Sequence, residues 1–488
     1  AEILKVALKE TPRITVQFDA KSVVKENMPS YNVWGTIPGR SEDMILLSGH
    51  YDSYFDGFQD DNCAIALMFG IARTLLEIGY KPEKTIVFCC MAAEEWGIEN
   101  SKYDWSTGAW QQVFKLRPEW QGKVIADLNF ELPAYAHNPW DAIRSTYEYE
   151  DFLTEFVKEF PVDARKVYPE GLGVQCPIET WSDDFSVAIS GIPSMVNEFS
   201  SAEFMETHYH SQFDNEDFYD EPVYRFHHNL YGKLVLAFDH TAVVPMDFER
   251  LFAAVEDSVE KALCEKTQAN ETNLLERLKK AKELGHQLYD QIQKINETYK
   301  NLLEAGKYEE AKAMAAEYAA LNSSLLYIFR KEQDYFVRLN WHDDVLFPQQ
   351  GVGENLKVIY KALGCLKEDD PEGALEAVYE IDNNRYAFLF DREVFRYFTE
   401  YVLNQPADRL KWGYGRIIHH ENLYDLVVSL KEKNKLQKAG ERPDLEEEYK
   451  ILLQAANAQE QCYRDDIDYM ASSVEKLLAA MEGCVQKQ

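Results

Sequence analysis

The sequence predicts an α/β domain with a mixed sheet flanked by helices, followed by an all-α helical-bundle domain. Between Met44 and Ser101, the apolar runs MILLSGH and TIVFCCM flank a long apolar helix pattern, which is the order of a strand–helix–strand unit. After residue 246, segments such as LLERLKKAKELGHQLYDQIQKI place apolar residues at helical spacing between charged faces. A chain of 488 residues is too long for one ordinary core. We therefore expect an entry segment over 1–43 and domains over 44–245 and 246–488.

The remaining elements follow from shorter patterns. Strand candidates alternate or run apolar between turn residues, and they are Ile14–Val24, Asn32–Gly39, Val124–Leu132 and Ile192–Phe199. Helices are expected over Asn100–Phe114 and Phe218–Thr241. Residues 134–180 are read as an irregular, aromatic excursion that lines a pocket.

Composition excludes several classes of partner. The net charge of -33 would repel nucleic-acid phosphates and anionic membrane surfaces. No run reaches the roughly 20 apolar residues of a membrane span, and no signal peptide opens the chain. The eight cysteines are scattered and read as mostly free thiols, which weakly favours a reducing compartment. The compartment stays open between cytoplasmic and secreted with the signal already removed.

Residue types that bind metals follow both strands of the central unit. His50 ends the first run and Asp52 follows it, Glu94 and Glu95 follow the second run, and Asp60-Asp61 precede the helix. Parallel strands end at one edge of the sheet, so these side chains are expected to converge there. Two divalent cations can activate water and polarise a carbonyl, provided that one carboxylate bridges them and another stays free as a base. Asp61 has two equally good interpretations: its side chain could cap the following helix, or it could lie beside the metal.

The motifs H-x-D, D-D-N, A-x-E-E-x-G and a later Y-H resemble the aminopeptidase-type dizinc metallopeptidases. That family includes bacterial leucyl aminopeptidases, aminopeptidase Y and glutamate carboxypeptidase II, and the resemblance covers about residues 30–245. It implies that His50 binds the first zinc ion, with Asp52 orienting it, and that Asp60 bridges two zinc ions. Glu94 matches the general base, and Glu95 matches a ligand of the second ion.

The resemblance also assigns the closing ligand and shows two departures. His210 is the expected last ligand, because it follows Tyr209 in the Tyr-His order, and His208 is its rival. Tyr209 is expected to stabilise the oxyanion. Glu131 stands where the family usually has an aspartate ligand, so its carboxylate reaches one methylene further. Asp184 replaces a common histidine, which puts substrate choice in doubt.

The function implied is a metal-dependent exopeptidase acting on a peptide or aminoacyl substrate, most simply an aminopeptidase with two zinc ions, although cobalt or manganese could replace zinc. A carboxypeptidase or dipeptidase would need cations such as Arg144 or Arg165 to hold a substrate carboxylate. A non-catalytic scaffold on the same fold is the third interpretation. The helical domain could support a homo-oligomer. Residues 1–25 resemble the tail of a protease-associated domain, so an upstream segment is expected.

Overall fold

The computed structural model describes residues 2–11, 13–23, 25, 28–97, 105–404 and 415–485, which form two compact units, 1–31 and 32–488. The first unit contains helix α1 (Glu2–Glu10). The strand predicted over Ile14–Val24 is wrong, because no strand occurs among the described residues of that segment. Alternation alone does not make a strand, since its backbone groups need a neighbouring strand to pair with.

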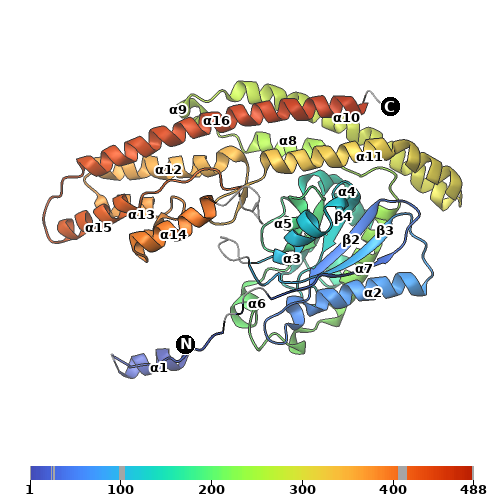
Figure 1. The fold of residues 1–488 in the computed structure, drawn as a ribbon, viewed down its shortest axis with the longest axis horizontal. Coiled ribbons are helices and arrows are strands. Elements are labelled where there is room, and N and C mark those ends of the chain that lie inside the picture. The colour runs from blue at the N-terminus through green and yellow to red at the C-terminus, as the bar shows by residue number, and fades with distance from the viewer. Residues whose placement is uncertain are drawn as a thin grey trace. The chain divides into compact units, whose positions relative to one another are not determined.

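The second unit is built on a seven-stranded mixed sheet with the order β1-β3-β2-β4-β7-β5-β6. Figure 1 labels its central strands β2, β3 and β4. Neighbouring strands are parallel except for the pairs β1–β3 and β5–β7. This confirms the predicted mixed sheet. The strands are β1 (Val33–Ile37), β2 (Met44–His50), β3 (Thr85–Met91), β4 (Val124–Asn129), β5 (Trp140–Ser145), β6 (Gly171–Gln175) and β7 (Ser194–Asn197).

Helices cover both faces of the sheet centre. Ile45 and Leu47 of β2 lie in the cluster that includes α2 (Cys63–Glu77) and α7 (Glu221–Asp239). Leu46 lies in a second cluster with α3 (Thr107–Gln111) and α5 (Asp183–Ala188). Burial on both faces explains why the central strands read as continuous apolar runs.

The structure changes two of the predictions, those for residues 134–180 and for residues 100–114. The excursion over 134–180 is not irregular, because it contains β5, helix α4 (Glu150–Glu159) and β6. Polar residues hid β5, since Asp141 pairs with His227 at 3.1 Å and Arg144 pairs with Glu198 at 3.4 Å. The first part of the helix predicted over Asn100–Phe114 lies outside the described residues, and α3 forms its later part.

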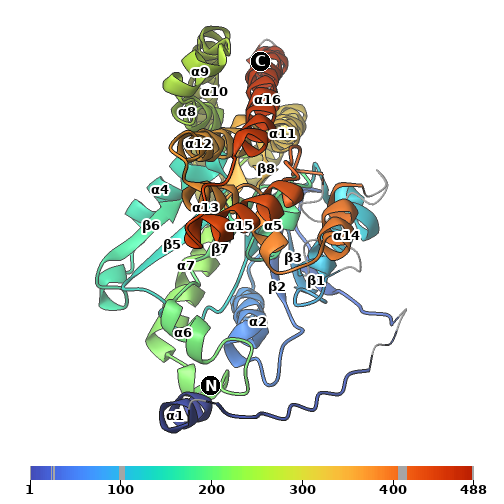
Figure 2. The same cartoon turned by 90° about the vertical axis from the view of Figure 1, so that its left-hand side faces the viewer.

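Helices make up nearly all of the described chain after residue 246, as predicted, and Figures 1 and 2 show α8, α10, α11 and α16 packed together. The one departure is the short pair β8 (Arg338–Leu339) and β9 (Val345–Leu346). The helices are α8 (Phe248–Asp257), α9 (Lys261–Thr267), α10 (Glu271–Glu304), α11 (Tyr308–Phe336), α12 (Pro348–Lys367), α13 (Pro371–Val378), α14 (Arg392–Leu403), α15 (Tyr424–Lys438) and α16 (Glu446–Val485).

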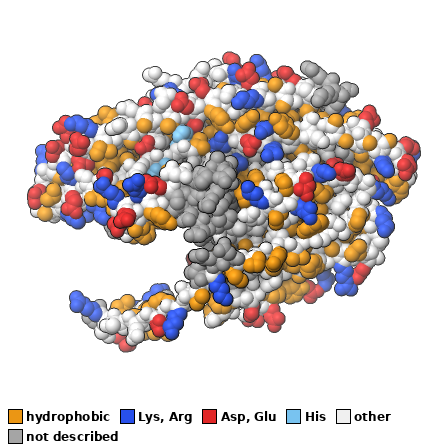
Figure 3. All heavy atoms as spheres, in the orientation of Figure 1, with side chains coloured by type: hydrophobic (Ala, Val, Ile, Leu, Met, Phe, Trp, Pro, Cys, Tyr) orange, Lys and Arg blue, Asp and Glu red, His pale blue; other side chains and the backbone are white. Residues whose placement is uncertain are grey.

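The distribution of surface charge and the character of the helices concern binding to membranes and to other protein chains. On the face drawn in Figure 3, acidic and basic side chains are interspersed across the helices. Among the described residues, no helix combines the length and the apolar character needed to cross a bilayer. Self-association through the helical part stays a prediction.

One hydrophobic core joins the sheet to the helices that follow it. The cluster that buries Leu47 and Phe238 continues into Leu278 of α10, Phe329 of α11 and Met470 of α16. The division into domains at residue 245 stays a prediction, since the two regions share this core.

Two buried asparagines fix the segment that connects the two regions. Asn296 Oδ1 accepts hydrogen bonds from the amides of Ala242 and Val243, each at 2.9 Å. Asn322 Oδ1 accepts from the amide of Val244 at 2.9 Å. Since both asparagines lie on helices of the bundle, the connecting segment is held in place by hydrogen bonds as well as by apolar packing.

Replacing Asn296 by alanine is expected to lower the free energy of unfolding by about 1–3 kcal/mol, because two buried amides lose their acceptor. Chemical denaturation of the purified protein measures this. Asn301→Ala on the exposed side of α10 is the matched control, and its stability should change by no more than about 0.5 kcal/mol. Equal losses in both variants would contradict the role of Asn296.

Candidate metal centre

The predicted metal-binding residues meet at the carboxyl ends of three neighbouring parallel strands. His50 is the last residue of β2, which lies between β3 and β4. Glu94 and Glu95 follow β3, and Glu131 follows β4. His50 and the three glutamates are all less than 9% exposed. The strand order therefore brings together groups that are far apart in the sequence.

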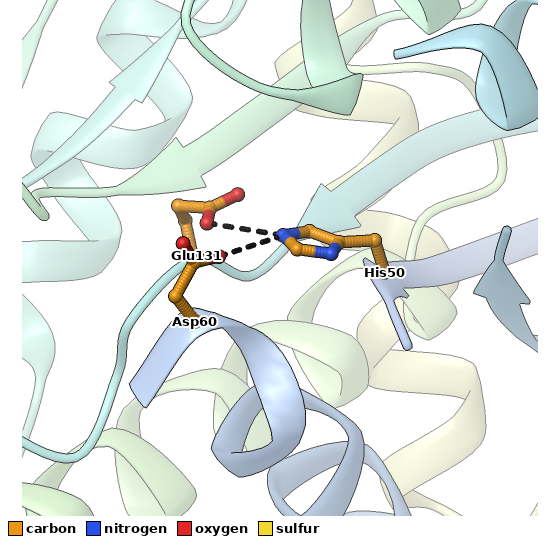
Figure 4. Close-up of side chains that lie close together, drawn as sticks. All are labelled: His50, Asp60 and Glu131. Carbon is orange, nitrogen blue, oxygen red and sulfur yellow. Dashed lines mark ion pairs between the residues drawn. The ribbon is translucent and has the colours of Figure 1, made fainter. Parts of the chain in front are cut away.

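The first group contains His50, Asp60 and Glu131, whose side chains point toward one another in Figure 4. His50 Nε2 lies 3.1 Å from Asp60 Oδ1 and 3.4 Å from Glu131 Oε1. One nitrogen and two carboxylate oxygens converge here, which is a donor set that suits zinc.

The second group contains Asp60, Glu95 and His210. His210 Nε2 lies 3.2 Å from Asp60 Oδ2 and 2.9 Å from Glu95 Oε2. The rival His208 lies outside this group, and its ring packs against Phe218 with 3.9 Å between centroids. The geometry thus places His210, and not His208, beside the carboxylates.

Asp60 belongs to both groups, because each of its oxygens faces a different histidine. Its loop is held by Asp214, whose carboxylate accepts from the amides of Gln59 at 2.9 Å and Asp60 at 3.1 Å. Glu95 Oε1 is buried without a hydrogen-bond partner, and Asp60 Oδ2 has no hydrogen bond besides its ion pair with His210. Orphaned carboxylate oxygens of this kind fit cations as their missing partners.

The charges of the cluster are strongly perturbed by one another. Burial opposes ionisation of Asp60, yet His210 and His50 together lower its pKa to about 2. Burial also opposes a charge on His50, but Glu94 and Glu131 outweigh it and raise its pKa well above the ordinary value. The pKa of Glu94 is raised, mainly by burial. Several buried carboxyls crowd around two histidines, and divalent cations would stabilise the ionised forms of these carboxyls.

Asp52 and Asp61 support the strand ends. The Asp52 carboxylate accepts from the amides of Glu94 at 3.1 Å and Glu95 at 3.2 Å. His50 Nδ1 is closer to the Asp52 backbone carbonyl, at 2.9 Å, than to its carboxylate, at 3.7 Å. Asp61 accepts from the amides of His50 and Leu132 and makes no cap bond to α2, so the helix-cap interpretation is wrong.

Sequence reasoning missed the residues that hold Glu131. Ser182 Oγ donates to Glu131 Oε2 at 2.6 Å and accepts from Asn129 Nδ2 at 2.6 Å. Asn197 accepts from the Glu131 amide at 3.0 Å and donates to its carbonyl at 2.6 Å. The side chain and backbone of Glu131 are therefore both fixed, which positions its longer side chain. The only sequence signal is that Ser182 immediately precedes α5 and that Asn197 ends β7.

Replacing Ser182 by alanine is expected to weaken metal binding about 10–100-fold, because Glu131 loses the group that orients it. Competition with a chromophoric chelator measures this affinity. Ser190→Ala is the matched control, since Ser190 is a buried serine just after α5 whose hydroxyl bonds Val187. Unchanged affinity in the Ser182 variant would show that Glu131 does not depend on this hydrogen bond.

The other residues singled out from the sequence lie near the cluster or behind it. The Tyr209 ring stacks on His210 with 3.7 Å between centroids, and burial with the nearby acids raises its pKa, so it keeps its proton. Asp183 accepts from Ser106 at 2.8 Å, and burial raises its pKa to about 7. Asp184 is only 1% exposed, which argues against a place on the substrate wall.

The fold and the cluster together define an α/β protein that gathers metal-ligating side chains at the carboxyl ends of its parallel strands. Residues 32–235 match the family model described as Peptidase family M28. The α/β part of the chain is thus similar to that family. The helical part after residue 246 lies outside the match.

Individual relatives match only part of their length. A probable glutamate carboxypeptidase from Arthroderma benhamiae is 24% identical, covering 45% of this chain and 32% of that protein. Probable leucine aminopeptidase 2 from Aspergillus fumigatus is 29% identical, covering 28% of this chain and 29% of that protein. The zinc aminopeptidase BSAP from Bacillus subtilis is 19% identical, covers 42% of this chain and 49% of its own, and has a TM-score of 0.32. The chain spans about a third of the length of these curated relatives.

Proposed function

We propose that this protein is a metal-dependent exopeptidase, and most specifically an aminopeptidase that holds two zinc ions. His50, Asp60 and Glu131 would hold one ion, and Asp60, Glu95 and His210 the other. The observation that carries the proposal is the position of Asp60, whose Oδ1 and Oδ2 lie 3.1 and 3.2 Å from two different histidines. A carboxylate shared in this way suits a pair of cations.

Each remaining residue has a task in peptide hydrolysis. When bound, the ions supply Lewis acidity for the carbonyl and lower the pKa of water. Glu94 lies outside both ligand groups, with Oε2 at 3.9 Å from His50 Nε2, so it is free to take a proton from water and pass it to the leaving amine. Tyr209 keeps its hydroxyl proton and can donate a hydrogen bond to the developing oxyanion.

The charges of the site are better suited to binding the amino end of a peptide substrate than its carboxyl end. Arg144, which would have to hold a substrate carboxylate, already pairs with Glu179 at 3.2 Å and Glu198 at 3.4 Å. Arg165 is exposed on a short turn. By contrast, the carboxylates around the centre would attract a free ammonium group. These features support an aminopeptidase over a carboxypeptidase or dipeptidase.

Metal analysis combined with a panel of free and N-blocked aminoacyl anilides and dipeptides tests the proposal. We expect two zinc ions per chain, hydrolysis of the free substrates, and loss of hydrolysis when the amine is blocked. Cleavage of blocked substrates would point to a carboxypeptidase. A protein that binds no zinc in excess and cleaves no substrate would support a scaffold and refute the proposed enzyme.

A further inference from the structure

A second pocket lies between the α/β part and the bundle, and none of the cluster residues lines it. Its volume is about 390 Å³. The α/β part contributes Tyr147, Ile178 and Phe185, and the later chain contributes Leu251, Phe336 and Phe347. We call this the junction pocket. Pockets with mostly apolar walls at the junction of two regions are the usual places for small ligands.

Aromatic packing and hydrogen bonds hold the walls in place. The rings of Tyr147 and Phe347 stack with 6.1 Å between centroids, and Phe336 meets Phe347 edge-on at 6.5 Å. The Phe347 amide donates to Gln350 Oε1 at 2.8 Å, which fixes the start of α12. Protein interiors rarely leave voids larger than a water molecule, so a space of this size between fixed walls is suited to a ligand.

The charges around the junction pocket select against anions. Its lining contains no Lys, Arg or His among the described residues, and its one charged residue is Asp257. Two buried glutamates are sequence neighbours of lining residues. Glu148 follows Tyr147, Glu332 precedes Gln333, and both glutamates are at most 1% exposed. The nearby Arg416 guanidinium is bound to the backbone carbonyls of Gln333 and Val337. A negatively charged ligand would therefore lose its hydration and find no cation in the lining to pair with.

We propose that the junction pocket binds a small, largely apolar molecule that carries no negative charge. The apolar side chains provide the burial, and Thr146, Ser258 and Gln333 in the lining offer hydrogen bonds to a hydroxyl or amine group. This site is separate from the metal centre and does not depend on the proposed peptidase activity.

Nile red, an uncharged apolar dye, is the probe for a fluorescence titration of the full chain. Wild type is expected to bind it at one site. In Ala254→Trp the new indole occupies the pocket that Ala254 lines, and binding should weaken at least about tenfold because the apolar space is filled. Ala253→Trp on the same helix is the matched control, because Ala253 is not part of the lining. Equal affinities in all three proteins would overturn the proposal.

Competition tests the charge preference. Decanol should displace the dye at a concentration at least about tenfold lower than decanoate at pH 8, because the carboxylate finds no cation in the pocket. Equal displacement by both, or better displacement by decanoate, would overturn the assignment to ligands without negative charge.

A measurement on wild type covers the case in which Ala254→Trp fails to fold. An uncharged alkanol carrying a diazirine is photolysed with the protein, and the labelled peptides are identified by mass spectrometry. Labelling should concentrate on α8 and on residues 336–350. Labelling confined to other parts of the chain, or its absence, would overturn the proposal.

Discussion

Replacing Glu94 by glutamine is expected to lower kcat by about 10²–10⁴-fold and to leave the metal content unchanged. Glutamine has nearly the same shape but cannot accept the proton from water. Glu94 lies outside both groups of metal-binding side chains, so the variant should retain both ions. Steady-state kinetics on a free aminoacyl anilide, paired with metal analysis of the same sample, measures both quantities.

The control for this substitution is Glu119→Gln, which changes an exposed carboxylate that belongs to neither group of metal-ligating side chains. Its kcat should equal that of wild type. Retained activity in the Glu94 variant would show that another group is the base. Loss of metal from that variant would instead make Glu94 a ligand.

Replacing His210 by alanine is expected to reduce the bound metal from two ions per chain to about one. His210 is the only histidine in the second group, and an ion that keeps only Asp60 and Glu95 loses its nitrogen ligand. The remaining ion would still have His50, Asp60 and Glu131. Inductively coupled plasma mass spectrometry after dialysis at a fixed zinc concentration gives the stoichiometry.

His208→Ala is the matched control, because His208 lies two residues away and packs against Phe218. It should keep both ions. If the His208 variant lost an ion while the His210 variant kept two, the assignment of the second group would be reversed.

The sequence was sufficient for the parts of the fold that rest on local patterns. Apolar runs on strands buried on both faces predicted β2, β3 and β4, and the polar residues at their ends located His50, Glu95 and Glu131. β5 and β6 were missed, because polar residues such as Asp141 and Arg144 interrupt the pattern and find their partners only in the folded chain. Pattern reasoning has no access to such long-range pairs.

The residues of the candidate site likewise divide into those that the sequence predicts and those that it does not predict. Side chains with metal-binding chemistry could be located from residue type and spacing. The groups that hold them, Asp214, Ser182 and Asn197, could not, because each acts through a hydrogen bond to residues at least 51 positions away. Their residue types are common in loops, so nothing in the sequence sets them apart.

The common core of the sheet and the bundle restricts how the protein can move. Two bodies that share one close-packed interior cannot open and close about a hinge without breaking that packing. If the protein has the proposed activity, exclusion of bulk water would have to come from short surface segments near the cluster, such as the turn that carries Tyr209 and His210. Measurements of millisecond dynamics should find their largest signals there, with the long helices moving as one rigid block with the sheet.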